Sequence, residues 1–411
     1  MTLRENGYFI QDLEVLEICK QFGTPLYVYD GEKIAQQVDS LKQAFSDVNL
    51  KIKYACKANT NISILKLMNR LGVELDVVSP QEMYLGLHSG FDSSQITFTS
   101  SGVSFDEIEE AVNNKVLVNI DNLPTLKLFG QKYGNSVPVM LRIRPNVIGG
   151  GNIKIMTGHK DSKFGIAIEQ KEQILSIVSQ FDIDVIGLHQ HTGSDIKDGN
   201  TFVNAASVML DLAFSFPNLK FMDFGGGFKV AYKEGDVSTN MQDLGKKLTK
   251  SFKDFCSKYG KELELWFEPG KYLVSESGYL FASANVVKEN PNKTLIGLNT
   301  GLNHLIRPMM YDAYHEVINV SKPNKEASKM YDIVGYMCET DDIAKERNMP
   351  SANQNDVFCI LNAGAYGFTM ASNYNSRFKP AEVLIFENKA FLIRKREEFS
   401  DILNNQILIE F

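Results

Sequence analysis

Eight short apolar runs, rich in β-branched residues, recur through the first two thirds of the chain, and helical segments separate most of them. The runs lie at residues 51–57, 73–79, 96–101, 116–120, 137–144, 183–191, 219–224 and 263–267. Apolar residues recur at helical spacing between them, for example in 105–114, 202–214 and 241–259. Eight strands that alternate with helices predict a (β/α)8 barrel. An open, doubly wound sheet is the alternative, because a strand count alone does not prove closure.

The pattern changes after about residue 280, where strand-like runs follow one another with few helices between them. These runs lie at residues 280–287, 293–298, 331–337, 356–361 and 382–386. They predict a second, β-sandwich-like domain over residues 279–411. A strand at 25–29 precedes the first barrel strand, so residues 1–30 are expected to join this second domain. Residues 31–278 are then left for the barrel.

Net charge and cysteine content indicate the cellular compartment and the classes of binding partner. The 411 residues carry a net charge of -7, which argues against nucleic acid or an anionic membrane as the main partner. The polar start lacks the apolar core of a signal peptide, and no apolar run approaches membrane-spanning length. The five cysteines are scattered without a CxxC pair, which is typical of a reducing compartment. We therefore expect a cytoplasmic protein.

Lys57 is placed where the first barrel strand ends. A lysine at the mouth of a buried strand can lose its proton by desolvation and act as an amine nucleophile that forms a Schiff base. A surface lysine at a strand end is the simpler interpretation of this position alone. The choice depends on what the other strands present, because the active sites of such barrels lie where strands end.

The other predicted strand ends carry polar and glycine-rich segments. They are Asp76–Ser79, Arg142 with Arg144, His189–Ser194, Asp223–Gly227 and Glu268–Lys271. Gly225–Gly227 and Gly270 can offer backbone N–H groups to a phosphate, and Ser194 and Lys271 add a hydroxyl and a positive charge. A glycine triplet is also simply a tight turn. A Gly-rich stretch near residues 145–165 is a candidate active-site loop.

A phosphate site, a reactive lysine, a histidine and a carboxylate at one rim together indicate pyridoxal 5'-phosphate. Glu268 can pair with the protonated pyridine nitrogen, and His191 can lie flat against the ring. A histidine buried in the core is the alternative for His191. No metal site is expected at His189 and His191, because no carboxylate or thiol lies at ligand spacing nearby.

Several motifs then carry a resemblance that runs from about residue 25 to 390. They are Tyr54–Asn59, Ser162–Gly165, His191–Ser194, Gly225–Gly227, Glu268–Gly270, Arg307–His315, Cys338–Glu339 and, longest, Gly364–Arg377. With them the chain resembles the pyridoxal-phosphate decarboxylases of the alanine-racemase-like barrel fold. Within that group it is most similar to the diaminopimelate decarboxylases, carboxy-lyases that form lysine in the last step of its biosynthesis.

The resemblance implies roles for individual residues. Lys57 would hold the cofactor covalently, His191 would stack on its ring and Glu268 would bind its pyridine nitrogen. The residues implied for its phosphate are Ser194, Gly227, Gly270 and Tyr366. Cys338 would return a proton to the substrate after carbon dioxide leaves, and it would arrive from the other subunit of a homodimer. From the sequence alone, a lone cysteine is more often a small buried hydrophobe.

Substrate choice follows from the two ends of meso-diaminopimelate, each of which is an amino-acid group. Arg307 and Tyr311 can bind the distal carboxylate and Glu339 the distal ammonium group. Tyr366 and Lys271 are also expected near the substrate. Lys271 departs from the arginine that is usual in this family, and a lysine acts only as a point charge. Another basic or polyamine-related amino acid is the alternative substrate, and a catalytically silent regulatory relative is a further alternative.

Overall fold

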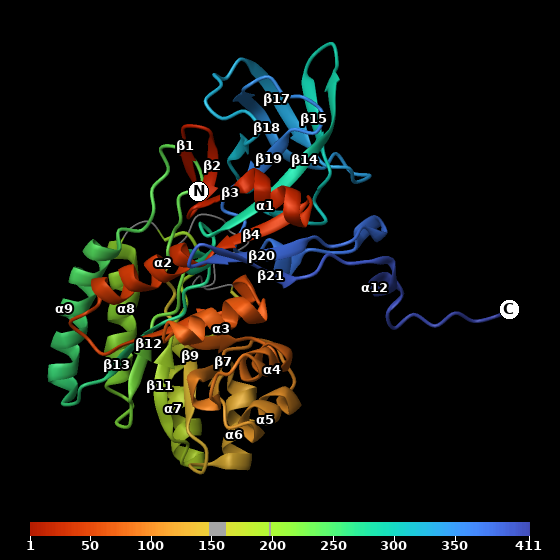
Figure 1. Ribbon diagram of the computed structural model, residues 1–411. Coiled ribbons are helices and arrows are strands. Elements are labelled where there is room, and N and C mark those ends of the chain that lie inside the picture. Colours follow the sequence, from red (N-terminus) through yellow and green to blue (C-terminus); the bar gives the residue numbers. More distant parts are fainter. Residues whose placement is uncertain (148–161, 197–198) are drawn as a thin grey trace. The chain divides into compact units, whose positions relative to one another are not determined.

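The computed structural model describes residues 1–147, 162–196 and 199–411. It contains two compact units. One comprises residues 35–231 and 237–273, and the other comprises residues 1–34, 232–236 and 274–411. We refer to them as the barrel unit and the β unit (Figure 1).

Eight parallel strands of the barrel unit form a closed barrel within the described residues. They are β5 (Leu50–Ala55), β6 (Glu74–Val77), β7 (Ile96–Phe98), β8 (Leu117–Ile120), β9 (Val139–Arg144), β11 (Val185–His189), β12 (Phe221–Asp223) and β13 (Glu264–Phe267). Pairing of β13 with β5 and of β8 with β9 completes the ring. The predicted barrel is thus confirmed and the open sheet is wrong. A two-residue strand, β10 (Ile166–Ala167), pairs with β9.

Helices lie outside these strands in Figure 1. They are α2 (Gly31–Ala44), α3 (Ile62–Arg70), α4 (Pro80–His88), α5 (Phe105–Asn113), α6 (Leu123–Tyr133), α7 (Lys171–Phe181), α8 (Gly199–Ala213) and α9 (Met241–Tyr259). The short helix α10 (Lys271–Val274) follows β13 in the chain. Short polar residues begin several of them, because a side-chain oxygen accepts from a backbone N–H that has no partner inside the helix. Ser79, Ser104, Asn122 and Asn240 do this for α4, α5, α6 and α9.

The β unit is mainly strand, as the sequence predicts, and it includes the N-terminal strand β4 (Leu26–Asp30). A mixed sheet has the order β18 (Asp342–Met349), β17 (Lys329–Val334), β15 (Thr294–Leu298), β14 (Gly278–Glu289), β4, β20 (Ala381–Phe386) and β21 (Lys389–Arg394). To its side, β19 (Val357–Ile360) pairs with β14 and with β16 (Val317–Asn319). A small sheet of β1 (Thr2–Arg4), β2 (Gly7–Ile10) and β3 (Leu13–Glu14) precedes α1 (Val15–Phe22). Two short helices, α11 (Arg307–Tyr311) and α12 (Phe399–Leu403), complete the unit.

The core of the β unit joins segments that are far apart in the sequence. Val28, Phe281, Cys359 and Val383 belong to one buried cluster, together with Ile18 of α1. Such burial explains why the chain before the barrel folds with the chain after it.

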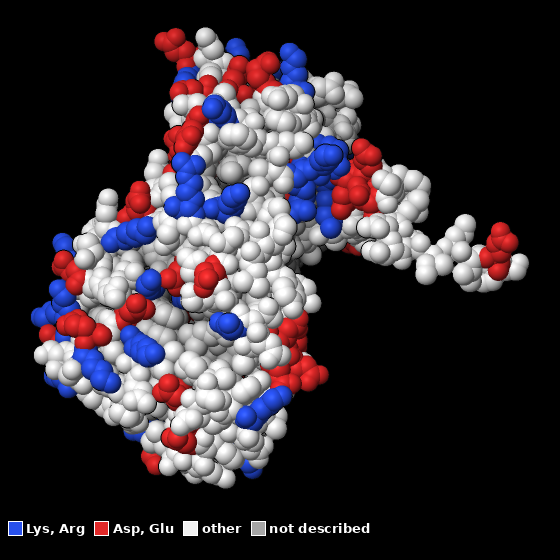
Figure 2. All heavy atoms as spheres, turned by 60° about the horizontal axis from the view of Figure 1, so that its bottom comes forward, with Lys and Arg blue, Asp and Glu red and all other residues white. Residues whose placement is uncertain are grey.

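Charged side chains of both signs are interspersed over the face drawn in Figure 2. Among the described residues, no helix combines the length and the apolar character that crossing a membrane requires.

Candidate active site

Lys57 lies directly after β5, in the single 3-10 turn Cys56–Ala58, as the sequence predicts. Its side chain is 44% exposed, and Nζ lies 3.4 Å from Oδ2 of the buried Asp76 on β6. The carboxyl-terminal ends of two neighbouring strands thus bring an amine beside a buried carboxyl group.

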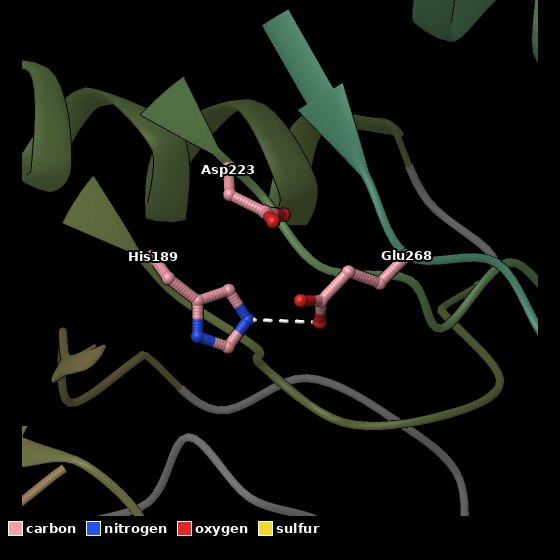
Figure 3. A group of neighbouring side chains, drawn as sticks. All are labelled: His189, Asp223 and Glu268. Carbon is pink, nitrogen blue, oxygen red and sulfur yellow. Dashed lines mark ion pairs between the residues drawn. The ribbon is translucent and has the colours of Figure 1, made fainter. Parts of the chain in front are cut away.

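Glu268 lies in a buried cluster with His189 and Asp223 (Figure 3). His189 ends β11, Asp223 ends β12 and Glu268 directly follows β13, and these three strands are neighbours in the barrel. Nε2 of His189 lies 3.0 Å from Oε2 of Glu268. One nitrogen or oxygen atom from each of the three side chains lies within 4.8 Å of the others. Thr99 adds a hydroxyl donor 3.3 Å from Oε1 of Glu268.

The buried carboxyl groups differ in charge state. Burial and the nearby Glu268 raise the pKa of Asp76 to about 8, and the same two causes raise the pKa of Asp223 well above its usual range. For Glu268, burial acts to raise the pKa, but His189 and the charge of Lys57 outweigh it and lower the pKa. Glu268 is therefore the ionised member of the group near neutral pH.

The spacing of residues along the sequence argues against a metal ion, but the folded chain brings together residues that this spacing does not reveal. The expectation rests on the lack of a carboxylate at ligand spacing from His189 and His191. Asp223 and Glu268 nevertheless reach His189 from the two strands that follow it in the barrel. Residues so far apart in the sequence leave no local spacing signal.

His191 lies beyond the end of β11 and is fixed by the glycine turn. Its Nδ1 accepts a hydrogen bond of 3.2 Å from the backbone N–H of Gly226. Burial, followed by the charge of Arg142, lowers the pKa of His191 to about 3. The imidazole is thus neutral at physiological pH, which suits a ring that lies against another aromatic ring.

The turn Gly225–Gly227 has no room for side chains. A Cβ on Gly226 would lie 2.3 Å from the carbonyl oxygen of Glu268, and one on Gly227 would lie 2.0 Å from that of Gly193. Gly227 also has a φ of +91°, which side chains rarely allow. The backbone therefore packs closely where the last three barrel strands end.

Lys271 is paired with an acid beside Ser194. Its Nζ lies 2.6 Å from Oδ1 of Asp195, and the lysine side chain is 11% exposed. Gly270, next to Lys271, lies close to Ala55 and Ala58 on either side of Lys57. The predicted anion-binding residues of the barrel unit thus lie on segments that surround the strand ends.

In the β unit, the structure brings Arg307 beside the Gly364–Phe368 segment. Its guanidinium donates to the carbonyl oxygen of Ala365 over 3.4 Å and lies 5.0 Å from the centre of the Tyr232 ring. Arg307 is buried, and Tyr311 at the other end of α11 is half-buried. Tyr366 is half-buried and has a φ of +56°.

Cys338 and Glu339 lie in an exposed loop of the β unit, and two adjacent residues hold their side chains. The amide of Asn375 donates to Sγ of Cys338 over 3.3 Å. The hydroxyl of Tyr374 donates to Oε1 of Glu339 over 2.6 Å. All five cysteines are described, and the other four are buried. Cys338 is thus not the small core residue that a lone cysteine most often is.

Some functional contacts were not predicted. Asn119, Thr99 and Asp223 support His189 and Glu268, yet the first two read simply as polar residues within strand-like runs. Tyr374 and Asn375 belong to the longest motif, but nothing in the sequence pairs them with Cys338 and Glu339. Most of the predicted loop at 145–165, including Gly149–Gly151, lies outside the described residues.

A family model of the "pyridoxal-dependent decarboxylase, pyridoxal binding domain" matches residues 31–275. A diaminopimelate decarboxylase of Methanothermobacter thermautotrophicus is 35% identical over 99% of this chain and 97% of its own length. The chain belongs to the diaminopimelate decarboxylase family. The enzyme of that name from Bacillus subtilis is 33% identical over 98% of this chain and 96% of its own length.

Solved structures agree with this family assignment. The diaminopimelate decarboxylase of M. jannaschii superposes with a TM-score of 0.91 at 29% identity, over 99% of this chain and 98% of that one. The Helicobacter pylori enzyme, solved in complex with L-lysine, has a TM-score of 0.86 at 31% identity, over 95% of this chain and 98% of that one. This chain is therefore a pyridoxal-phosphate-dependent carboxy-lyase.

The described residues of the barrel unit fit that cofactor. An amine lies at a strand end, an ionised acid is buried nearby, a neutral imidazole faces the same region and a side-chain-free turn borders it. A single ionised carboxylate among several buried carboxyl groups suits a protonated ring nitrogen, because each buried charge needs one partner of opposite sign.

Asp76 makes the stability of the cofactor-free protein depend on pH. Its folded pKa of about 8 exceeds the value of about 3.9 for an unfolded aspartate, so the folded state holds an extra proton between these values. Asp76 therefore reduces stability as pH rises from about 4 to about 8. We expect the gain in melting temperature of Asp76→Asn over wild type to be larger at pH 7.5 than at pH 5. The underlying free energy changes by up to about 1.4 kcal/mol per pH unit.

Thermal unfolding of the two apoproteins at both pH values tests this expectation. Asp39→Asn, on the exposed surface of α2, is the matched control and should show the same small effect at both. An Asp76→Asn effect that is equal at pH 5 and 7.5 would show that Asp76 is ionised throughout.

Proposed function

We propose that this chain converts meso-2,6-diaminopimelate to L-lysine and carbon dioxide, the last step of lysine biosynthesis. The observation that carries the proposal is the buried, ionised Glu268 beside His189, on the same barrel rim as Lys57. A carboxylate at this position keeps a pyridine ring protonated, and a protonated ring favours the loss of carbon dioxide from a bound amino acid.

The chemistry that pyridoxal phosphate supplies when bound is an electron sink for the electron pair released by decarboxylation. Lys57 would hold the cofactor covalently, and Asp76 would take part in setting the charge of its amine. His191 would support one face of the ring. Backbone N–H groups of Gly227 and Gly270 would bind the phosphate.

Two further side chains are proposed for the same phosphate, the Ser194 hydroxyl and Tyr366. Lys271 carries the charge that an arginine carries in other members, but its contact with Asp195 offsets that charge. We therefore assign Lys271 a supporting role at the phosphate and a weak one toward the substrate carboxylate.

Cys338 is the proposed acid that returns a proton to the α-carbon, and we propose that it acts in the other subunit of a homodimer. Its exposure in one chain supports this assignment, since an acid that serves a partner must lie at a surface. The contact from Asn375 holds Sγ in one orientation. Glu339, held by Tyr374, would bind the distal ammonium group of the substrate.

Arg307 and Tyr311 are the proposed receptors of the distal carboxylate. Arg307 is buried, and its guanidinium donates a long hydrogen bond to the carbonyl oxygen of Ala365 and lies over the Tyr232 ring. A buried cation is costly unless an anion neutralises it. A substrate carboxylate would do so, whereas ornithine, arginine and lysine have none at the distal end.

The proposed substrate can be tested by comparing four amino acids. The purified holoenzyme should release carbon dioxide from meso-diaminopimelate and, at equal concentration, far less from L-ornithine, L-arginine or L-lysine. Arg307→Ala should lower kcat/KM on diaminopimelate by about 30- to 1,000-fold, equivalent to about 2–4 kcal/mol.

Arg4→Ala, which removes an exposed arginine of the same unit, is the control and should leave kcat/KM unchanged. Preferential release from another substrate would favour the alternative reading, a decarboxylase of a basic or polyamine-related amino acid. A cofactor-loaded protein inactive on all four substrates would favour a regulatory relative.

Mixing two inactive variants tests whether one active site combines Lys57 of one subunit with Cys338 of the other. Lys57→Ala and Cys338→Ala should each be nearly inactive alone. In a homodimer whose sites combine both chains, random mixing gives hybrid dimers in which one of two sites has both residues. Unfolding and refolding an equal mixture should then restore about a quarter of the wild-type activity. Failure of the mixture to regain activity, with refolded wild type active, would place Lys57 and Cys338 of one chain in one site.

A further inference from the structure

A buried asparagine holds the side of His189 that faces away from Glu268. Asn119 lies on β8 and is 4% exposed, and His189 is fully buried. The side-chain amide nitrogen of Asn119 lies 2.8 Å from Nδ1 of His189, and Nε2 of His189 lies 3.0 Å from Glu268. Both ring nitrogens of one imidazole are therefore engaged, one by an amide and one by a carboxylate.

These two contacts determine where the imidazole carries its proton. An amide nitrogen can only donate, so Nδ1 must accept and cannot bear a hydrogen. A carboxylate can only accept, so Nε2 must bear one. The arrangement therefore describes a neutral imidazole whose Nε2 carries the proton and lies 3.0 Å from Oε2 of Glu268, in a polar contact that does not have the geometry of a hydrogen bond. The opposite orientation of the Asn119 amide would put hydrogens on both nitrogens and make His189 a cation.

The charges around His189 favour the neutral form. Arg142 and Lys57 are cations that disfavour a further positive charge, and burial acts in the same direction. Glu268 favours the cation, and Asp223, the other acid of the cluster, is held protonated by burial and by Glu268. The neighbouring His191 is neutral. Desolvation is the largest of these effects, and it lowers the pKa of His189.

We propose that Asn119 is a positioning residue that, through His189, keeps Glu268 a full anion facing the cofactor. Asn119 fixes the tautomer, and the neutral His189 stabilises the carboxylate through the dipole of its nearby Nε2–H without neutralising it. An imidazolium would cancel much of the negative charge that Glu268 presents to the ring nitrogen. This inference rests on the proposed role of Glu268 and extends it to a residue two strands away from His189.

The test measures ring protonation directly rather than turnover. 4′-Deoxypyridoxine 5′-phosphate lacks the aldehyde, so it can bind without reacting, and its ultraviolet absorption differs between the protonated and neutral ring. Titration of the analogue bound to the apoprotein gives the pKa of its ring nitrogen. Asn119→Asp places a carboxylate at Nδ1 and draws a second proton onto His189. We expect the ring pKa to fall by about one unit, a tenfold change in the protonation ratio.

Asn122→Asp is the matched control on the same segment. Asn122 begins α6, where an aspartate oxygen can accept from Thr125 in the same way. The change also replaces the amide hydrogen bond to Asp121 with a second carboxylate, so it controls for an added acid that does not contact His189. The control should leave the ring pKa unchanged. A ring pKa in Asn119→Asp that equals that of wild type and of Asn122→Asp would overturn the inference.

His189→Gln shows whether His189 is neutral or charged in the wild-type protein. This test does not require a stable Asn119 variant. A glutamine amide is a neutral donor, so the ring pKa should stay within a few tenths of a unit of the wild-type value. A rise of about one unit would mean that wild-type His189 is an imidazolium, which contradicts the proposal. Glu268→Gln tests the underlying assignment, because it should lower the ring pKa strongly. An unchanged value there would remove Glu268 from the ring nitrogen, a failure distinct from that of Asn119.

Discussion

The contact between His189 and Glu268 is the interaction on which the site depends. A carboxylate buried to this degree would normally take up a proton, because removing its charge from water costs several kcal/mol. The hydroxyl of Thr99 donates a hydrogen bond to this carboxylate, and the imidazole of His189 makes a polar contact with it 3.0 Å away. Asp76 and Asp223 also have polar contacts, with the Lys57 amine at 3.4 Å and the Gly225 N–H at 2.8 Å, but burial and the charge of Glu268 outweigh them and raise both pKa values. Glu268 is thus ionised, whereas the neighbouring Asp76 and Asp223 tend to keep their protons.

The closed barrel brings the residues of this site together. Parallel strands all end at the same rim, so residues that follow different strands meet there although they are far apart in the sequence. Thr99 and Glu268, for example, are 169 residues apart. β11, β12 and β13 are neighbours in order, which places His189, Asp223 and Glu268 side by side. The glycine turn after β12 allows the backbone to pass closely beside Glu268 and Gly193. Its N–H at Gly226 in turn orients His191.

Much of the fold could be predicted because buried parallel strands are short apolar runs. Seven of the eight barrel strands lie within the predicted ranges, β5 begins one residue before its predicted range, and α9 has the predicted bounds. In the β unit, β18 was missed because Asp342–Met349 is rich in charged residues and several of its positions are exposed. β21 was missed because its partly exposed residues give no clear alternation. Hydrophobic periodicity identifies strands only where burial imposes it.

The site was predictable at strand ends and much less so beneath them. Lys57 and Glu268 follow strands, so their position alone marks them as candidates. Asn119 lies within a strand, and its importance arises only from contact with His189 across the barrel interior. Asn375 and Cys338 are 37 residues apart, and only the folded loops bring them together. The resemblance singles out Lys271 as a departure from the usual arginine, but its pairing with Asp195 is visible only in the structure.

The most direct test of the central claim is to identify the lysine that holds the cofactor. Borohydride reduction of the loaded enzyme would make the carbon–nitrogen bond permanent, and peptide mass mapping would then locate the pyridoxyl group. The account predicts that the label lies on Lys57 and is lost in Lys57→Ala. A label on Lys271 or on another lysine would contradict it, because the acid, the imidazole and the glycine turn would then be arranged around the wrong amine.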